Sequence, residues 1–199
     1  MPPTFFFDLS SPFAYLAAER IDDLLPGAEW RPIAFGALIG QIGKRPWSLT
    51  PGTERDATFA EIARRASERG LPEIVYPPGW PAESYSLMPL RAALIAGKHG
   101  RMREFVRHAY RITFVEGRTL NDLATILEAV SAAGLDAREV AAAVERPDVK
   151  DRLRANTDAA IARGVAGVPT VEIGGELFWG DDRLEDAAAA LRSPPSALS

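Results

Sequence analysis

The chain has 199 residues, of which 47% are hydrophobic and 25% are charged, and this apolar content favours a soluble globular protein over a disordered chain. It contains no cysteine, which excludes disulfide scaffolds, cysteine-ligated zinc or iron–sulfur sites and a cysteine nucleophile. The formal net charge of −4 disfavours a nucleic-acid-binding protein, because such proteins carry a basic stripe.

The first 35 residues predict the order strand, helix, strand. Thr4 to Asp8 is a short apolar run that stops at a Ser-Ser-Pro break, which is typical of a buried strand. Pro12 suits the first turn of a helix, and an apolar face predicts that this helix continues to Leu25. Residues 28–35 predict a second strand.

The middle of the chain is predicted to be helical after one long loop. The segment 36–52 contains four glycines and two prolines, and it predicts a loop with at most one short helical turn. Asn121 and Asp136 are the expected N-caps of two helices. Apolar periodicity predicts helices at residues 54–69, 87–98, 101–113, 121–133, 136–145 and 148–163.

The last part of the chain predicts a hairpin followed by a helix. Residues 168–173 alternate at strand period, Gly174-Gly175 suits a two-residue turn, and residues 176–179 return as a second strand. Gly180-Asp181-Asp182 then begins a final helix that reaches Arg192. The order β-α-β at the front and β-β-α at the back predicts an α/β protein with a thioredoxin-like fold and a large all-helical insertion. The expected division is residues 1–45 plus 150–199 for the thioredoxin-like part and 46–149 for the helical part.

The sequence predicts no metal site, no membrane-spanning segment and no signal peptide. His99 and His108 are nine residues apart, so at about 100° per residue they lie on opposite sides of a helix and do not share a metal. The sequence contains no run of about 20 apolar residues of the kind that spans a membrane. The N-terminus lacks the basic start and apolar stretch of a signal peptide, so we expect a cytoplasmic protein.

Three segments are candidates for chemistry, each where a strand meets a helix or turn. Ser10 and Ser11 precede a helix, whose free N–H groups favour an anion, although a serine there often only caps the helix. Val168-Pro169 begins a strand, either as a plain strand start or as a lip whose backbone pairs with a peptide-like ligand. Asp181 and Asp182 either cap the last helix or bind a ligand ammonium. In a thioredoxin-like fold these three segments converge on one groove.

The stretches FFFDLSSPFAYLA and GVAGVPTVEIGGELFWGDDRLE resemble the 2-hydroxychromene-2-carboxylate isomerase family. This family is related to kappa-class glutathione transferases and to disulfide-forming, DsbA-like proteins. The redox relatives carry Cys-Pro-x-Cys where this chain reads Ser11-Pro12-Phe13-Ala14, so it cannot cycle a disulfide.

The resemblance implies glutathione as cofactor and assigns its contacts. Ser11 would donate a hydrogen bond to the glutathione sulfur, with Ser10 as second choice. Val168 would precede a cis proline, Pro169, and pair with the cysteinyl backbone. Asp181 and Asp182 would bind the γ-glutamyl end, with Asp182 the expected partner of its ammonium.

The chain departs from the family on the substrate side. Lys44 stands where the family often has an asparagine that contacts glutathione, and we expect Lys44 to meet the anionic ligand. The stretches Thr53 to Asp56 and Tyr85 to Arg91 match the family loosely, so the acceptor is not carried over. Phe13, Trp47 and Trp80 indicate either a hydrophobic site or ordinary packing.

The sequence thus predicts a glutathione-dependent isomerase in which Ser11 activates the thiol. A kappa-like glutathione transferase acting on an apolar electrophile is the alternative enzyme, and a redox-inactive thioredoxin-like binding module is the alternative of another class. The expected partner is a small aromatic or apolar electrophile, with no nucleic acid or membrane, and the relatives imply a homodimer.

Overall fold

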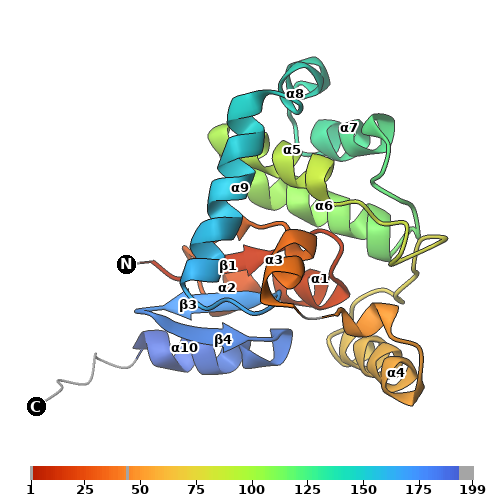
Figure 1. Cartoon of the computed structure of the whole chain (residues 1–199), viewed down its shortest axis with the longest axis vertical. Helices are drawn as coiled ribbons and strands as arrows, with labels where there is room; N and C mark the ends of the chain where they lie inside the picture. The colour runs from red at the N-terminus through yellow and green to blue at the C-terminus, as the bar shows by residue number, and fades with distance from the viewer. Residues whose placement is uncertain (1, 44, 193–199) are drawn as a thin grey trace, which may run out of the picture.

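The computed structural model describes residues 2–43 and 45–192 as a four-stranded sheet surrounded by helices (Figure 1). The strands are β1 (Thr4–Phe7), β2 (Glu29–Pro32), β3 (Thr170–Ile173) and β4 (Glu176–Trp179). The α-helices are α1 (Pro12–Ala18), α2 (Ile21–Leu24), α3 (Phe35–Ile42), α4 (Thr53–Glu68), α5 (Leu87–Lys98), α6 (Met102–Phe114), α7 (Leu123–Ala132), α8 (Ala137–Ala143), α9 (Pro147–Ala162) and α10 (Leu184–Arg192). Two short 3-10 helices are η1 (Trp47–Leu49) and η2 (Asp181–Arg183).

The sheet has the strand order β2-β1-β3-β4. β1 runs parallel to β2 and antiparallel to β3, and β3 and β4 form a hairpin that turns at Gly174-Gly175. The parallel pair needs a crossover, which α1 and α2 provide. This topology confirms the predicted thioredoxin-like α/β fold.

β1 is apolar throughout because both faces of the sheet are covered. Phe5 and Phe7 pack on one face against Trp30 of β2, with ring centroids 5.0 and 5.8 Å from the indole. Phe6 packs on the other face with Ile33 and with residues of α3 and α9. A strand buried on both faces is a continuous apolar run instead of an alternating one.

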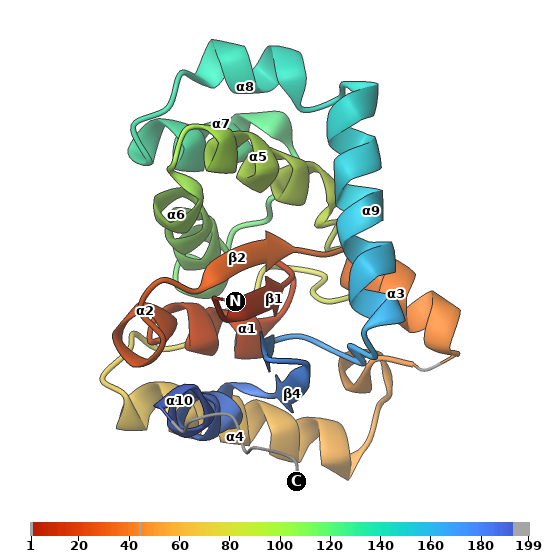
Figure 2. The same cartoon turned by 90° about the vertical axis from the view of Figure 1, so that its left-hand side faces the viewer.

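The helices between β2 and β3 lie in two separate regions of the molecule. Helices α5 to α8 form a group on one side of the sheet, and α9 leads from that group back to it (Figures 1 and 2). Helix α4 instead lies beside α1, away from that group (Figure 1). The division into residues 1–45 plus 150–199 and 46–149 stays a prediction, and α4 is the part of the second range that reaches the start of α1.

The prediction of a long loop over residues 36–52 is wrong, because Phe35–Ile42 forms the helix α3. Leu38 of this helix is fully buried, and Phe35 and Ile39 pack beside it against Phe6. Burying such a side chain contributes about 1.5–3 kcal/mol, whereas a glycine inside a helix costs about 1 kcal/mol. Packing therefore outweighs the two glycines that suggested a loop.

The predicted helix from Pro12 to Leu25 is broken into α1 and α2. The backbone of Arg20 leaves the helical region, with φ −122° and ψ −20°. The break lets α2 pack against α10, where Ile21 and Leu25 are fully buried and Arg20 forms an ion pair with Glu185. This packing joins residues far apart in the chain, so local periodicity gave no sign of it.

One of the two predicted N-caps lies at the neighbouring residue. Asp136 caps α8 as expected, and its carboxylate accepts hydrogen bonds from the backbone of Arg138 and Glu139. Helix α7 is capped by Asp122, which accepts from the Thr125 N–H at 2.9 Å. Asn121 instead donates to the Glu83 carbonyl and fixes the loop before α5.

Within the described ranges, no helix is long and apolar enough to cross a membrane. The same part of the chain holds no group of three or more His, Asp or Glu side chains suited to a metal ion. His99 lies at the end of α5 with its Nε2 3.0 Å from Glu139 Oε1.

Candidate functional site

The turn after β1 places Ser11 at the start of α1. Ser11 is the N-cap, and its Oγ accepts a hydrogen bond from the Ala14 N–H at 3.2 Å. Its hydroxyl proton is directed at the carbonyl oxygen of Val168, 3.5 Å away. This distance is at the long limit of a hydrogen bond, so the proton is available to a better acceptor.

The loop before β3 lies against this turn, as expected for a thioredoxin-like fold in which the three candidate segments converge. The Val168–Pro169 peptide bond is cis, which confirms that expectation of the family resemblance. The N–H of Val168 has no hydrogen-bond partner within the described residues, and its carbonyl accepts only the long 3.5 Å contact from the Ser11 hydroxyl. The backbone of Val168 is therefore open to pairing with an extended ligand.

Ser10 is held differently from Ser11, and a buried acid holds it. Asp8 is fully buried at the end of β1, and its Oδ1 accepts from both the N–H and the hydroxyl of Ser10 at 2.8 Å. Its Oδ2 accepts from the Phe35 N–H at 2.8 Å and the Ser86 hydroxyl at 3.0 Å. Burial raises the pKa of Asp8 above its ordinary value, while these hydrogen bonds oppose the rise. Since the Ser10 hydroxyl is engaged by Asp8, Ser11 is the better donor to a ligand.

The two predicted aspartates have different surroundings. Asp181 is fully buried, and its carboxylate accepts from Arg65 Nη1 at 2.6 Å and Arg69 Nη1 at 2.5 Å. Asp182 has a side chain that is 55% exposed, and only its Oδ2 approaches Arg65, at 3.3 Å. Both oxygens of Asp181 are thus used inside the protein, whereas Asp182 faces solvent and can meet a ligand ammonium.

A groove of about 330 Å³, here called the Asp182 groove, joins these features. Val168, Pro169 and Gly180 lie along it, with Arg65 and Asp182 at its polar end. Gly167 is required there, because a Cβ at this position would lie 2.4 Å from Nε1 of Trp179. Trp179 therefore crosses directly over the backbone beside Val168 and walls the groove.

A second hollow of about 290 Å³, here called the aromatic cleft, adjoins the first and is lined by Ser11. Phe13 and Trp47 line both hollows, whereas Trp80 lines only the aromatic cleft. The ring centroid of Trp47 lies 6.0 Å from that of Phe13 and 6.2 Å from that of Trp80. The structure thus brings the three predicted aromatic residues together as a wall, with Ser10, Ser11 and Ser86 among the polar lining.

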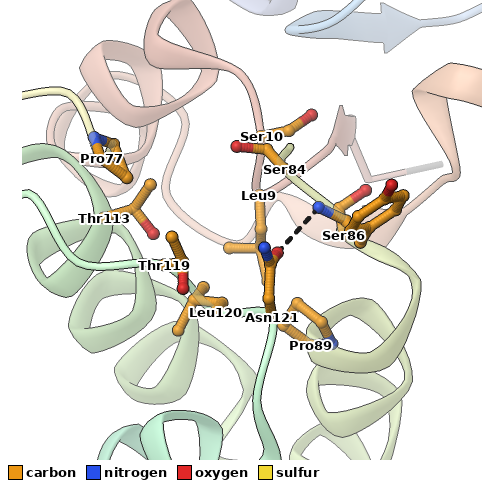
Figure 3. Close-up of a pocket in the computed structure, with 11 residues that line it drawn as sticks. Leu9, Ser10, Pro77, Ser84, Ser86, Pro89, Thr113, Thr119, Leu120 and Asn121 are labelled. Carbon is orange, nitrogen blue, oxygen red and sulfur yellow. Dashed lines mark hydrogen bonds between the residues drawn. The ribbon is translucent and has the colours of Figure 1, made fainter. Parts of the chain in front are cut away.

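A small pocket of about 20 Å³ lies behind the cleft, large enough for about one water molecule (Figure 3). Ser10 and Ser84 lie at one end of it, and Leu120 and Asn121 lie at the other. Asn121 accepts from the Tyr85 N–H at 3.0 Å, the bond drawn in Figure 3. This pocket is too small for a substrate, so the aromatic cleft is the candidate site for one.

Of the predicted site residues, Ser11, Val168, Pro169, Asp181 and Asp182 come together, and Lys44 lies outside the described residues. Sequence reasoning missed Asp8, because it was the last residue of an apolar run, and it missed Arg65 and Arg69. Arg65 belongs to α4 and Arg69 is its C-cap, and the mixed charges of this helix looked like an ordinary solvated face. Nothing local marks an arginine whose partner lies more than 100 residues away.

Comparison with known proteins identifies the family of the chain and agrees with its fold. A family model described as a DSBA-like thioredoxin domain matches residues 4–192. A curated protein named 2-hydroxychromene-2-carboxylate isomerase, from Sphingobium xenophagum, is 29% identical over 191 residues, which cover 91% of this chain and 93% of that protein. This match confirms the resemblance drawn from the two ends of the chain.

Solved structures agree on the fold. The structure of a 2-hydroxychromene-2-carboxylate isomerase superposes with a TM-score of 0.83 at 24% identity, covering 96% of this chain and 94% of that one. The cytosolic disulfide reductase DsbM from Pseudomonas aeruginosa, solved with GSH, gives a TM-score of 0.65 at 19% identity and covers 96% of this chain and 97% of its own.

Proposed function

The chain belongs to the family of DSBA-like thioredoxin domains, and from this premise we propose that it is a glutathione-dependent isomerase of the 2-hydroxychromene-2-carboxylate type. The observation that carries the proposal is the meeting of Ser11 and Val168 where the Asp182 groove and the aromatic cleft adjoin, since Val168 lines both hollows and Ser11 lines the cleft. With no cysteine in the chain, any thiol used here must come from a bound ligand.

The Asp182 groove fits the chemical groups of glutathione. The free N–H and weakly bonded carbonyl of Val168 suit the backbone of the cysteinyl residue. Asp182 is exposed at the end of the groove for the γ-glutamyl ammonium. The Ser11 hydroxyl, next to Val168, is placed to donate to the sulfur. A solved structure with this fold and GSH, the DsbM reductase, supports the same choice of ligand.

The positions of Ser11 and of the three aromatic residues suggest what each does in the proposed reaction. Glutathione, when bound, would supply a nucleophilic thiol for reversible addition to a conjugated electrophile. A thiol has an ordinary pKa of about 8.5, and the hydrogen bond from Ser11 lowers it because it stabilises the charged form. Phe13, Trp47 and Trp80 hold a flat electrophile beside the sulfur and exclude water from it.

Two measurements distinguish this function from its alternatives. Calorimetric titration shows whether glutathione binds, and an ultraviolet assay of chromene ring opening shows whether that reaction needs glutathione. An isomerase returns glutathione unchanged after each turnover, whereas a kappa-like transferase consumes it in a conjugate. The proposal fails if millimolar glutathione does not bind, and binding without any reaction would instead identify a binding module.

Asp182→Ala is expected to weaken glutathione binding about tenfold, because a hydrogen bond to a charged group contributes about 1.5–3 kcal/mol. The thiol pKa of the bound glutathione should change little, since Asp182 is assigned to the ammonium end. Titration calorimetry measures the first effect and ultraviolet absorbance of the thiolate the second. An unchanged dissociation constant would remove Asp182 from the site.

Two further features belong to the proposal. Glutathione is the thiol of the cytosol, so the proposed reaction places the protein in the cytoplasm. The resemblance also implies a homodimer, which light scattering on the purified protein would detect.

A further inference from the structure

We propose that a hollow of about 330 Å³ beside the edge strand β2, here called the β2 hollow, binds a small molecule through a carboxylate or phosphate group. The hollow lies between β2, the end of α5, the start of α6 and the middle of α9, and β2 contacts both α5 and α9 (Figure 2). None of the described residues that line it also lines either hollow beside Ser11. The site is therefore separate from that of the proposed function.

The lining of the β2 hollow is positively charged, although the chain as a whole has a formal net charge of −4. Among the described residues, four cationic side chains and one carboxylate line it, namely Arg31, Lys98, Arg103, Arg152 and Glu29. Cations gathered around a hollow repel one another and raise the local concentration of anions. The charge of this lining therefore favours a bound anion.

Two of the four cations remain available to a ligand. Arg31 and Arg103 are used inside the protein, because each forms an ion pair with a carboxylate, at 2.6 and 3.0 Å. Lys98 of α5 approaches a carboxylate only at 3.9 Å, and Arg152 of α9 has no ion pair within the described part of the chain. A guanidinium binds a carboxylate or a phosphate through two parallel hydrogen bonds. An oxyanion between Lys98 and Arg152 would therefore contact both free cations.

The polar groups of the walls also lack an acceptor. Trp30 lines the hollow and is only 6% exposed, and its indole Nε1 has no hydrogen-bond partner among residues 2–43 and 45–192. Buried N–H groups nearly always have an acceptor, so this donor is an exception. Met102 and Arg103, in the first turn of α6, line the same hollow, and no side chain of a described residue caps that helix. The first N–H groups of a helix favour an anion. An oxyanion would thus supply the acceptors that these walls lack.

A small molecule fits this edge of the sheet better than an added strand of another protein. The carbonyl oxygens of Ala28 and Pro32 already accept hydrogen bonds from the side chains of Arg103, at 2.7 Å, and Asn156, at 3.2 Å. A strand added beside β2 would need these carbonyls, and Pro32 has no N–H to offer it. Side chains of α6 and α9 therefore block strand addition at both ends of β2.

The test uses inorganic phosphate and succinate as probes, at constant ionic strength and without glutathione, so its result does not depend on the proposed reaction. The indole N–H signal of Trp30 in a ¹H–¹⁵N spectrum reports on the hollow, and Trp30→Phe identifies that signal. We expect at least one probe to move the signal to a plateau, and the tighter probe identifies the group that is bound. The Lys98→Ala/Arg152→Ala variant, folded by circular dichroism, should bind that probe about tenfold more weakly or worse.

The matched control is Lys150→Ala/Arg154→Ala, which removes one lysine and one arginine, as the first double variant does. Both residues lie on α9 and line a different hollow. This control should bind the probe as the wild-type protein does. A Trp30 signal that neither probe moves, or undiminished binding by Lys98→Ala/Arg152→Ala, would overturn the proposal. Equal weakening in the two double variants would also overturn it, because net charge alone would then account for the binding.

Discussion

Ser11→Ala is expected to lower the glutathione-dependent isomerase rate by about 10²–10³-fold, the usual effect of removing one preorganised donor from a developing or stabilised anion. Ser11 is the side chain that joins the start of α1 to Val168, and its proton is held only by a 3.5 Å contact. Without the hydroxyl, the bound thiol returns toward its ordinary pKa and less thiolate is present at neutral pH. Steady-state kinetics with saturating glutathione measure the effect.

The control must separate this role from helix capping, because Ser11 also accepts from the Ala14 N–H. Replacing a serine cap by alanine costs about 1 kcal/mol, whereas glycine costs only a few tenths. Ser11→Gly should therefore lose the activity with little loss of stability, and Ser11→Thr, which keeps a hydroxyl, should retain most of it. An active Ser11→Gly protein would show that the hydroxyl has no part in the reaction.

Asp181→Asn is expected to reduce the free energy of unfolding by about 3 kcal/mol, because it leaves two arginines facing a neutral amide. Asp181 is fully buried, and it joins Arg65 of α4 and Arg69, the C-cap of that helix, to the turn η2. Removing one partner of a buried ion pair costs more than the pair contributes. Arg69 would keep no ion-pair partner among the described residues, whereas Arg65 keeps Glu61 and Asp182. Urea denaturation of the two proteins measures the difference.

Asp182→Asn is the matched control at the next position. Its side chain is 55% exposed, and its contact with Arg65 is 3.3 Å long, so its loss should cost less than about 1 kcal/mol. The same chemical change should thus affect stability at Asp181 and glutathione binding at Asp182. Equal losses of stability in the two variants would show that the buried ion pairs of Asp181 do not contribute more to stability than the exposed contact of Asp182.

Much of the fold could be predicted from the sequence because its ends have strong local signals. TFFF, the alternation before Gly174-Gly175 and the apolar helical faces each specify an element without reference to the rest of the chain. The helix α3 and the break at Arg20 could not be predicted in this way. Both depend on contacts with α9 or α10, which lie more than 100 residues later.

The candidate site divides in the same way. Ser11, Val168 and Asp182 could be chosen because the thioredoxin-like topology brings those three turns together. Asp8 and Arg65 were missed because their importance lies in what surrounds them. Asp8 is recognised only when Phe35 and Ser86 are seen to converge on it, and Arg65 only when Asp181 is seen beneath it.

The proposed role of Ser11 predicts a property of bound glutathione that can be measured directly. Ultraviolet absorbance of the thiolate, recorded against pH for the complex, gives the thiol pKa in the site. A hydrogen bond from Ser11 to the sulfur should give a pKa clearly below the ordinary 8.5 of a cysteine thiol in the wild-type complex, and a return toward 8.5 in the Ser11→Gly complex. Glutathione that binds with an unshifted pKa, or a lowered pKa that survives in Ser11→Gly, would contradict it.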